Sequence, residues 1–143
     1  MNKGTLLLVE DDPQAVILLR RIFKKKLDVT IAVASDGAEA LQYLTGTSTE
    51  ERQLQELPAL VLLDLDLPKV HGLEVLKRLR AHPRTKTLPV IILTADREID
   101  AAIGYMLGAN SFMRKPFDFE EFLRTLAGIR RGALVELTAG KNN

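Results

Sequence analysis

Apolar runs alternate with stretches of helical periodicity along almost the whole chain, and this alternation restricts the fold more than any other feature. Each run is short and nearly continuous, which is typical of strands buried on both faces of a parallel sheet. We expect strands at residues 5–9, 29–34, 60–63, 89–93 and 111–114, and helices at residues 13–26, 37–44, 72–81, 99–107 and 118–129. Strands and helices in alternation predict a doubly wound α/β fold whose helices cover both faces of the sheet.

Length and composition favour one soluble domain. We place the domain at residues 1–131, with residues 132–143 as a C-terminal tail that could form an interface. Lysine and arginine total 20 against 19 for aspartate and glutamate, a balance that argues against nucleic acid or a membrane surface as a partner. The chain has no cysteine, and we find neither a membrane span nor a signal peptide. We therefore expect a cytoplasmic protein.

Polar side chains follow four of the expected strands, at the edge where such sheets bind ligands. Three acids follow the first strand and one acid follows the third, and the fourth and fifth strands end at a hydroxyl and an ammonium group: Glu10, Asp11, Asp12, Asp64, Thr94 and Lys115. Carboxylates gathered at one edge repel each other unless a cation lies between them. Oxygen ligands favour a hard divalent ion, and Mg²⁺ is the usual partner of phosphate chemistry.

This set of groups is suited to phosphoryl transfer. A carboxylate can attack phosphorus and form an acyl phosphate. A metal ion, an ammonium group and a hydroxyl would then neutralise or bind the phosphoryl oxygens. Taken singly, these residues have ordinary structural interpretations, since the acids after the first strand could cap a helix and Asp64 could be a turn residue. Phe112, in the fifth expected strand, could likewise be a core aromatic.

As a set, the motifs strongly resemble the receiver domains of two-component response regulators. The likeness covers residues 4–130 and rests on LLVEDD at 7–12, LVLLDLDLP at 60–68, GLEVLKRLR at 72–80, PVIILTA at 89–95 and GANSFMRKPF at 108–117. It implies a flavodoxin-like sheet of five parallel strands in the order 2-1-3-4-5, with five helices. The loop at residues 45–57 and the segment YMLGANSFMRKPF further resemble the single-domain regulators that are paired with bacterial phytochrome kinases.

The resemblance assigns roles to individual residues. The implied Mg²⁺ ligands are Asp11, Asp12, Asp64 and the backbone carbonyl of Asp66, and the implied phosphoryl-binding and switch groups are Lys115, Thr94 and Phe112. Asp64 matches the phosphoacceptor, Thr94 the switch hydroxyl and Phe112 the switch aromatic. The likeness also implies a cis peptide bond between Lys115 and Pro116, and only X–Pro bonds adopt cis at low cost. His71 departs from the family, which often has Asp or Asn at that position.

The implied function is signalling. A histidine kinase, of which a bacterial phytochrome is one candidate, would phosphorylate Asp64 with Mg²⁺ present, and the chain would be a phosphoacceptor rather than an enzyme acting on other substrates. Output would pass through protein contacts, because we recognise no output domain. We expect the exposed Ile17 and Leu18 to contact the kinase. We also expect a symmetric homodimer through the fourth helix, the fifth strand and the fifth helix. Charged residues that include Arg97 and Arg130 would set its register, and Leu134 and Val135 of the tail would add apolar contact.

Two other interpretations remain open from the sequence. Asp64-Leu65-Asp66 also matches the DxD motif of haloacid dehalogenase-like phosphatases, although those enzymes carry DxD on the first strand and their metal-binding acids last. A pseudo-receiver that serves only as a binding module is the second, and it is disfavoured because no expected pocket residue is missing. Sustained turnover of a phosphomonoester would distinguish the phosphatase from a receiver, which is phosphorylated once per molecule.

Overall fold

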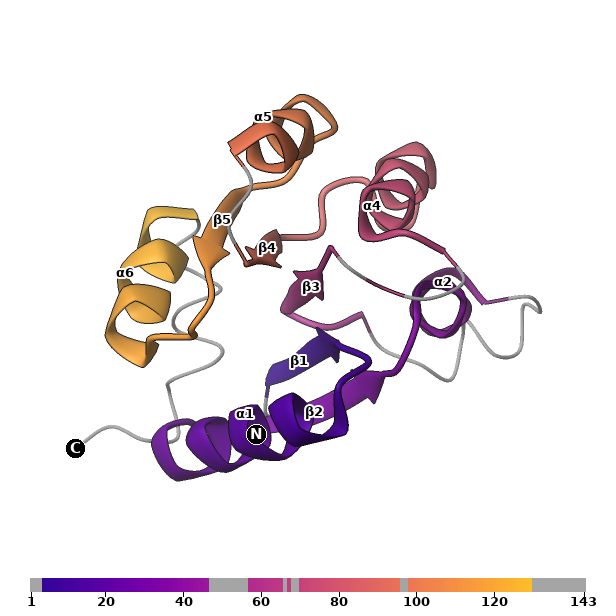
Figure 1. Cartoon of the computed structure of the whole chain (residues 1–143). Helices are drawn as coiled ribbons and strands as arrows, with labels where there is room; N and C mark the ends of the chain where they lie inside the picture. The colour runs from indigo at the N-terminus through magenta and orange to yellow at the C-terminus, as the bar shows by residue number, and fades with distance from the viewer. Residues whose placement is uncertain (1–3, 47–56, 66, 68–69, 96–97, 130–143) are drawn as a thin grey trace.

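The computed structural model describes residues 4–46, 57–65, 67, 70–95 and 98–129 (Figure 1). In this part of the chain five strands alternate with five helices, as the sequence predicts. The elements are β1 (Gly4–Val9), α1 (Pro13–Lys26), β2 (Val29–Ala34), α2 (Gly37–Thr45), β3 (Leu60–Asp64), α4 (Gly72–Ala81), β4 (Val90–Thr94), α5 (Glu98–Met106), β5 (Ser111–Arg114) and α6 (Phe119–Ile129). None of these described helices has the length and apolar character that crossing a membrane requires.

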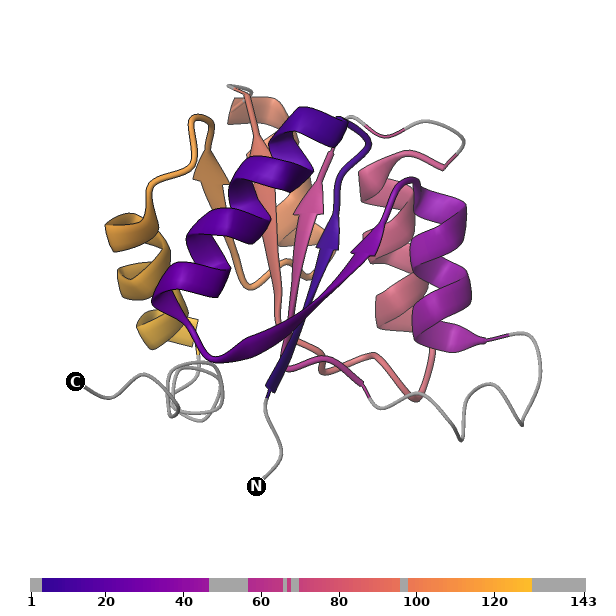
Figure 2. The same cartoon turned by 90° about the horizontal axis from the view of Figure 1, so that it is seen from below.

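All five strands are parallel and form one sheet in the order β2-β1-β3-β4-β5, which confirms the predicted flavodoxin-like topology. The strand arrows point the same way in Figure 2, so the carboxyl ends of the strands share one edge of the sheet. The chain passes from β1 to β2 on one side and then returns to β3 on the other side of β1. The order therefore reverses between β1 and β3, and ligand sites in such sheets lie at this switch point.

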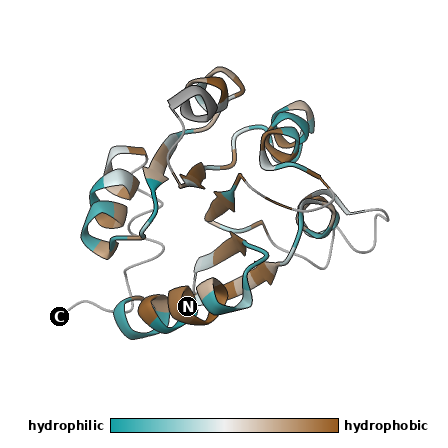
Figure 3. Cartoon of the chain, in the orientation of Figure 1, coloured by the Kyte–Doolittle hydropathy of each residue, from teal (hydrophilic) through white to brown (hydrophobic). Residues whose placement is uncertain are grey.

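Strand side chains alternate between two cores, one on each face of the sheet. Leu8 of β1 packs with Phe23 of α1 and Phe122 of α6, whereas the adjacent Val9 packs with Leu76 of α4. Figure 1 shows the same two layers, with α1 and α6 on one face and α2, α4 and α5 on the other. The hydropathy colours of Figure 3 follow this division, because the central strands β3 and β4 are almost entirely apolar and the helices carry polar residues as well. Burial on both faces explains why the strand sequences are nearly continuous apolar runs.

Local sequence signals set the helix ends. The Asp36 carboxylate accepts a hydrogen bond from the Glu39 amide at 2.7 Å, and the Asp118 carboxylate accepts one from the Glu121 amide at 3.1 Å, so both side chains cap the helices that follow them. Gly108 lies just beyond α5 with φ 105°, a conformation that residues with a Cβ rarely adopt. The positive φ of Gly108 lets the chain leave α5 and turn toward β5.

The first residue of α4 lies directly against the end of β3. A Cβ atom at Gly72 would lie 2.7 Å from the carbonyl oxygen of Asp64 and 2.7 Å from the Cα of Leu65. The Gly72 amide also donates a hydrogen bond to the Leu65 carbonyl at 3.1 Å. Because the crowded atoms belong to the backbone, a side chain at this position would displace the segment that carries Asp64.

We predict that Gly72→Ala lowers the free energy of unfolding by about 2 kcal/mol, because the added methyl group overpacks a backbone contact. Urea denaturation followed by circular dichroism measures this change. Gly128→Ala is the matched control, since a Cβ at that exposed position of α6 would meet nothing within 4 Å. The control should be stabilising by up to about 1 kcal/mol, owing to the better helix propensity of alanine. Equal stability of Gly72→Ala and the wild type would contradict the close packing of α4.

Candidate functional site

Three carboxylates meet at the carboxyl edge of the sheet. Glu10, Asp11 and Asp64 each place one carboxylate oxygen so that the three atoms lie within 4.8 Å of one another. Glu10 is 2% exposed and Asp64 is 3% exposed, whereas Asp11 is exposed at the mouth of the site. We call these three residues the acidic cluster.

The sheet register brings the acidic cluster together. Val9 of β1 pairs with Leu63 of β3, so the residues that follow them, Glu10 and Asp64, lie side by side. The Glu10 amide donates to the Ala34 carbonyl of β2 at 3.0 Å, which holds the end of β1 in place. The cluster therefore lies at the switch point between β1 and β3, where the sequence analysis expected it.

Lys115 provides the positive charge of the site. Its Nζ donates a hydrogen bond to Asp64 Oδ2 at 3.0 Å and lies 3.7 Å from Glu10 Oε1. The Lys115 amide donates to the Thr94 carbonyl at 2.8 Å, so the backbone after β5 is fixed against β4. The Lys115–Pro116 peptide bond is cis, as predicted. The convergence of Asp64, Thr94 and Lys115 on one edge is thus confirmed, although their chemical roles remain predictions.

Glu10 is held in an environment that disfavours its charge. Burial, and after it the adjacent Asp64 carboxylate, raises the pKa of Glu10 from 4.5 to about 7, although the Asp12 amide and Lys115 act in the opposite direction. Glu10 Oε2 accepts a hydrogen bond from the Asp12 amide at 3.2 Å. Glu10 Oε1 is buried without a hydrogen-bond partner in the described part of the chain. A buried carboxylate oxygen of this kind fits a divalent cation, which would both bind it and offset the neighbouring charges.

Asp12 does not lie where a Mg²⁺ ligand, its expected role, would have to lie. The Asp12 carboxylate accepts a hydrogen bond from the Gln14 amide at 3.0 Å and caps α1, so it does not join the acidic cluster. Glu10 takes the expected place of Asp12 beside Asp11, because Glu10 follows Leu6 and Leu8 in the alternation along β1, on the face of the sheet that Asp64 also shares. That alternation was the available signal for Glu10. Asp66, the other expected ligand, lies outside the described residues.

Thr94 and Phe112 share the face of the sheet that α5 covers. Thr94 ends β4 and is 2% exposed. Ile92 of β4 pairs with Phe112 of β5, so Thr94 lies two residues further along the neighbouring strand on the same face. The Phe112 ring is partly buried and contacts the ring of Tyr105 edge to face, with centroids 5.6 Å apart. A ring at this position therefore lies between the end of β4 and the surface of α5.

A parallel sheet with an acidic cluster, a lysine and a hydroxyl at its carboxyl edge defines a phosphoacceptor class of signalling domain, and the sequence comparison agrees. Residues 6–127 match the response regulator receiver domain family, and the chain belongs to this family. Receiver domains work with histidine kinases in two-component signalling. The match excludes the haloacid dehalogenase-like alternative, which belongs to another family.

Curated relatives are regulators of microbial signalling. The chain is 38% identical to the probable methanogenesis regulatory protein FilR2 of Methanothrix harundinacea over 128 residues, which cover 87% of this chain and 80% of FilR2. It is 34% identical to the alkaline phosphatase synthesis transcriptional regulatory protein PhoP of Bacillus subtilis, with 100% of this chain and 55% of PhoP covered. The chain thus spans about half the length of the transcriptional regulators that it matches.

Solved structures of similar chains include regulators of phytochrome systems. The bacteriophytochrome response regulator AtBRR is 40% identical, with a TM-score of 0.78 and coverage of 90% of this chain and 94% of AtBRR. The phosphorylated cyanobacterial phytochrome response regulator RcpA is 29% identical, with a TM-score of 0.72 and coverage of 93% and 95%. The Mn²⁺-bound response regulator Rcp1 is 31% identical, with a TM-score of 0.72 and coverage of 88% and 91%. The predicted likeness to phytochrome-paired regulators is confirmed.

We predict that, without divalent ions, the free energy of unfolding falls as the pH rises from about 5 to 8. Glu10 keeps its proton up to about pH 7 in the folded state but only up to 4.5 in the unfolded chain, so the folded state binds more protons between these values. The stability from this group is fully present below pH 4.5 and is lost as the pH rises through about 7. Urea denaturation in EDTA across this pH range measures the slope.

Glu10→Gln is the control for this pH dependence. The amide keeps the shape of the side chain but cannot titrate, so the fall in stability between these pH values should become clearly smaller. A slope unchanged by Glu10→Gln would show that another group is responsible and that the pKa of Glu10 is not raised.

Proposed function

We propose that Asp64 accepts a phosphoryl group from the phosphohistidine of a histidine kinase. The observation that carries this proposal is the position of the Asp64 carboxylate, which is buried at the end of β3, 3.0 Å from Lys115 Nζ and within the acidic cluster. In the transfer, the P–N bond of the phosphohistidine breaks as an O–P bond to an Asp64 oxygen forms, and the imidazole leaves. Lys115 offsets negative charge on the phosphoryl oxygens.

The divalent ion of the acidic cluster is proposed to be Mg²⁺. Glu10, Asp11 and Asp64 would hold it through carboxylate oxygens, and the resemblance adds the backbone carbonyl of Asp66. When bound, the ion supplies charge neutralisation and orientation for phosphoryl transfer. The buried Glu10 Oε1, which accepts no hydrogen bond within the described residues, supports a cation at this place, and so does the Mn²⁺-bound form of the similar Rcp1.

Phosphorylation is proposed to change the surface of β5 and α5 through Thr94 and Phe112. The Thr94 hydroxyl would move to donate a hydrogen bond to a phosphoryl oxygen and would leave space on its face of the sheet. The Phe112 ring, which has no hydroxyl to keep in solvent, would move into that space and away from Tyr105. The two packings of the Phe112 ring would then link phosphorylation of Asp64 on β3 to the surface formed by β5 and α5.

The kinase is proposed to be a bacterial phytochrome that contacts α1. The likeness to AtBRR and RcpA supports this class of kinase. Ile17 and Leu18 lie near the start of α1, beside the mouth of the site, and each is 56% exposed, as the sequence analysis expected. Apolar side chains so exposed beside the phosphoacceptor suit a contact with the helix that bears the phosphohistidine.

A symmetric homodimer is proposed through α5, β5 and α6. Ile103, Tyr105 and Met106 are 38%, 47% and 86% exposed, so α5 presents an apolar surface. Glu120 and Arg124 on α6 are exposed and carry opposite charges, which could pair across a two-fold axis and set the register. The expected contributions of Arg97, Arg130, Leu134 and Val135 fall on residues outside the described structure.

We predict that Asp64→Asn abolishes phosphorylation, because the amide keeps the shape but is not a nucleophile. Incubation with a phosphorylated kinase or with acetyl phosphate, followed by intact-mass measurement, gives the yield. Wild type in Mg²⁺ should gain one phosphoryl group per chain, and EDTA should prevent the gain. Asp12→Asn is the control and should retain phosphorylation, since Asp12 caps α1. A phosphorylated Asp64→Asn chain would refute the assignment.

We predict that Ile17→Lys slows phosphotransfer from the cognate kinase by about tenfold or more, because it places a charge in an apolar contact. Labelling by acetyl phosphate should be unchanged, because the acidic cluster is intact. Leu57→Lys, at an exposed apolar position before β3, is the matched control and should behave as wild type. Equal loss with both phosphodonors would indicate a damaged site instead of a docking surface.

We predict that the wild type sediments as a dimer and that Met106→Glu, which removes the most exposed apolar side chain of α5, shifts it toward monomer. Measurement with and without phosphorylation then tests whether Thr94 and Phe112 act on this surface. Thr94→Ala should remove any effect of phosphorylation on the association constant. Wild type that is monomeric in both states would contradict the dimer.

A further inference from the structure

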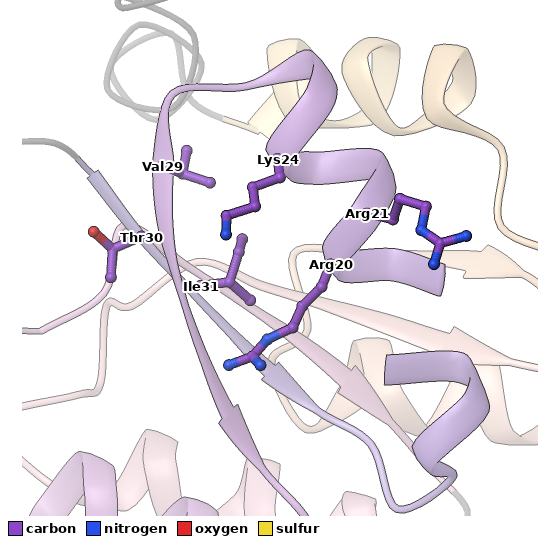
Figure 4. Close-up of a pocket in the computed structure, with 6 residues that line it drawn as sticks. All are labelled: Arg20, Arg21, Lys24, Val29, Thr30 and Ile31. Atoms are coloured by element: carbon purple, nitrogen blue, oxygen red, sulfur yellow. The ribbon is translucent and has the colours of Figure 1, made fainter. Parts of the chain in front are cut away.

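A groove far from the acidic cluster runs between the second half of α1 and the first half of β2. It encloses about 500 Å³ and is lined by Arg20, Arg21, Lys24, Val29, Thr30 and Ile31. Figure 4 shows the side chains of Arg20 and Lys24 projecting from α1 toward β2, on either side of Ile31. The groove lies toward the amino end of β2, whereas the acidic cluster lies at the carboxyl ends of the strands.

The groove is strongly cationic. Helix α1 carries Arg20, Arg21 and the run Lys24–Lys26 and has no acidic residue. Arg20 and Lys24 are exposed, and neither forms an ion pair within the described residues. Arg20 and Lys24 lie one helical turn apart, and like charges at this spacing repel each other. Their mutual interaction therefore does not stabilise their positions beside β2.

One wall of the groove is the edge of the sheet. β2 is the first strand in the sheet order and pairs only with β1 in the described structure. An edge strand leaves a row of N–H and C=O groups that another strand can pair with. Val29 and Ile31 of β2 are half-buried and Thr30 is exposed, so the edge offers apolar contact as well as backbone groups.

The lining distinguishes between possible occupants. A small phosphate ligand would need several donors that converge on it, whereas Arg20 and Lys24 stand about one helical turn apart and no aromatic ring lines the groove to stack on a base. A second copy paired edge to edge would bring the same cations of both copies together, which is repulsive. An extended segment with acidic side chains would pair with the β2 backbone and place carboxylates beside Arg20 and Lys24.

We propose that this groove binds an extended acidic segment of a partner protein, which adds to the sheet as a sixth strand beside β2. Alternate side chains of a strand point to the same face. Acidic residues at every second position of the segment would therefore meet Arg20 and Lys24, and small apolar residues between them would face the other side of the sheet. This contact would leave the carboxyl ends of the strands, where Asp64 lies, uncovered. The partner and the kinase could then bind the protein at the same time.

The test uses a fluorescent synthetic peptide of about eight residues in which glutamate and valine alternate, with both ends blocked. Fluorescence anisotropy against the full chain should show saturable binding, and hydrogen exchange should slow at the amides of β2. Arg20→Glu with Lys24→Glu should weaken binding by about tenfold or more, since two attractions become repulsions. Lys25→Glu with Lys26→Glu, which makes the same change of net charge at exposed residues of α1 outside the lining, is the matched charge control and should weaken binding only slightly.

Three results would overturn the proposal. One is equal binding of a peptide that has the same composition but carries all its glutamates in one consecutive run. Equal binding would indicate simple charge attraction instead of strand pairing. Another is binding that leaves the β2 amides unprotected. The third is stronger, Arg20- and Lys24-dependent binding to pyrophosphate or to phosphatidylserine vesicles, which would identify a phosphate ligand or a membrane surface instead. Thermal unfolding of each variant, monitored by circular dichroism, verifies that the fold is intact.

Discussion

The contact between Lys115 and two buried carboxylates is the interaction on which the rest of the site depends. Glu10 and Asp64 are almost fully shielded from water, and an isolated buried charge is strongly unfavourable. Lys115 lies 3.0 Å from one carboxylate and 3.7 Å from the other, so one ammonium group partly compensates both. Burial and the neighbouring Asp64 carboxylate raise the pKa of Glu10, and the negative charge that remains favours a divalent cation. A divalent cation bound there would offset this negative charge for the proposed phosphoryl transfer.

The scaffold around this contact is rigid because each element is fixed by backbone interactions. β1 and β3 lie between other strands, and their residues Leu8 and Leu62 are fully buried. The close approach of Gly72 to the backbone of Asp64 and Leu65 ties the start of α4 to the end of β3. The Arg80 guanidinium extends this bracing on the same face, since it donates to the carbonyls of Gly108 and Thr85 and to Asn110 Oδ1. In the proposed switch, this bracing would pass a small movement at Asp64 to a ring such as Phe112 instead of absorbing it in the backbone.

Helix α1 combines three surfaces with different chemistry. Its buried stripe, with Leu19 and Phe23, is part of one core of the domain. Its exposed start carries Ile17 and Leu18 beside the phosphoacceptor, and its second half carries the cations of the groove beside β2. Because the helix runs antiparallel to the strands, the apolar and cationic surfaces lie at opposite ends of the sheet. The two proposed contacts of this helix, one with a kinase and one with a second partner, would therefore not overlap.

The sequence by itself determined the elements, their order along the chain and the edge of the sheet where the chemistry lies. Those features depend on interactions between residues that are close in the sequence. Examples are the apolar runs of the strands, the capping carboxylates of Asp36 and Asp118 and the positive φ of Gly108. Only the tertiary structure decided which of three consecutive acids turn inward. Glu10 and Asp11 join Asp64, whereas Asp12 caps α1, because the strand alternation ends and the helix begins within these three residues. The sequence likewise did not predict the groove beside β2. The groove forms only because α1 packs next to the edge strand β2, where Arg20 and Lys24 reach its exposed side.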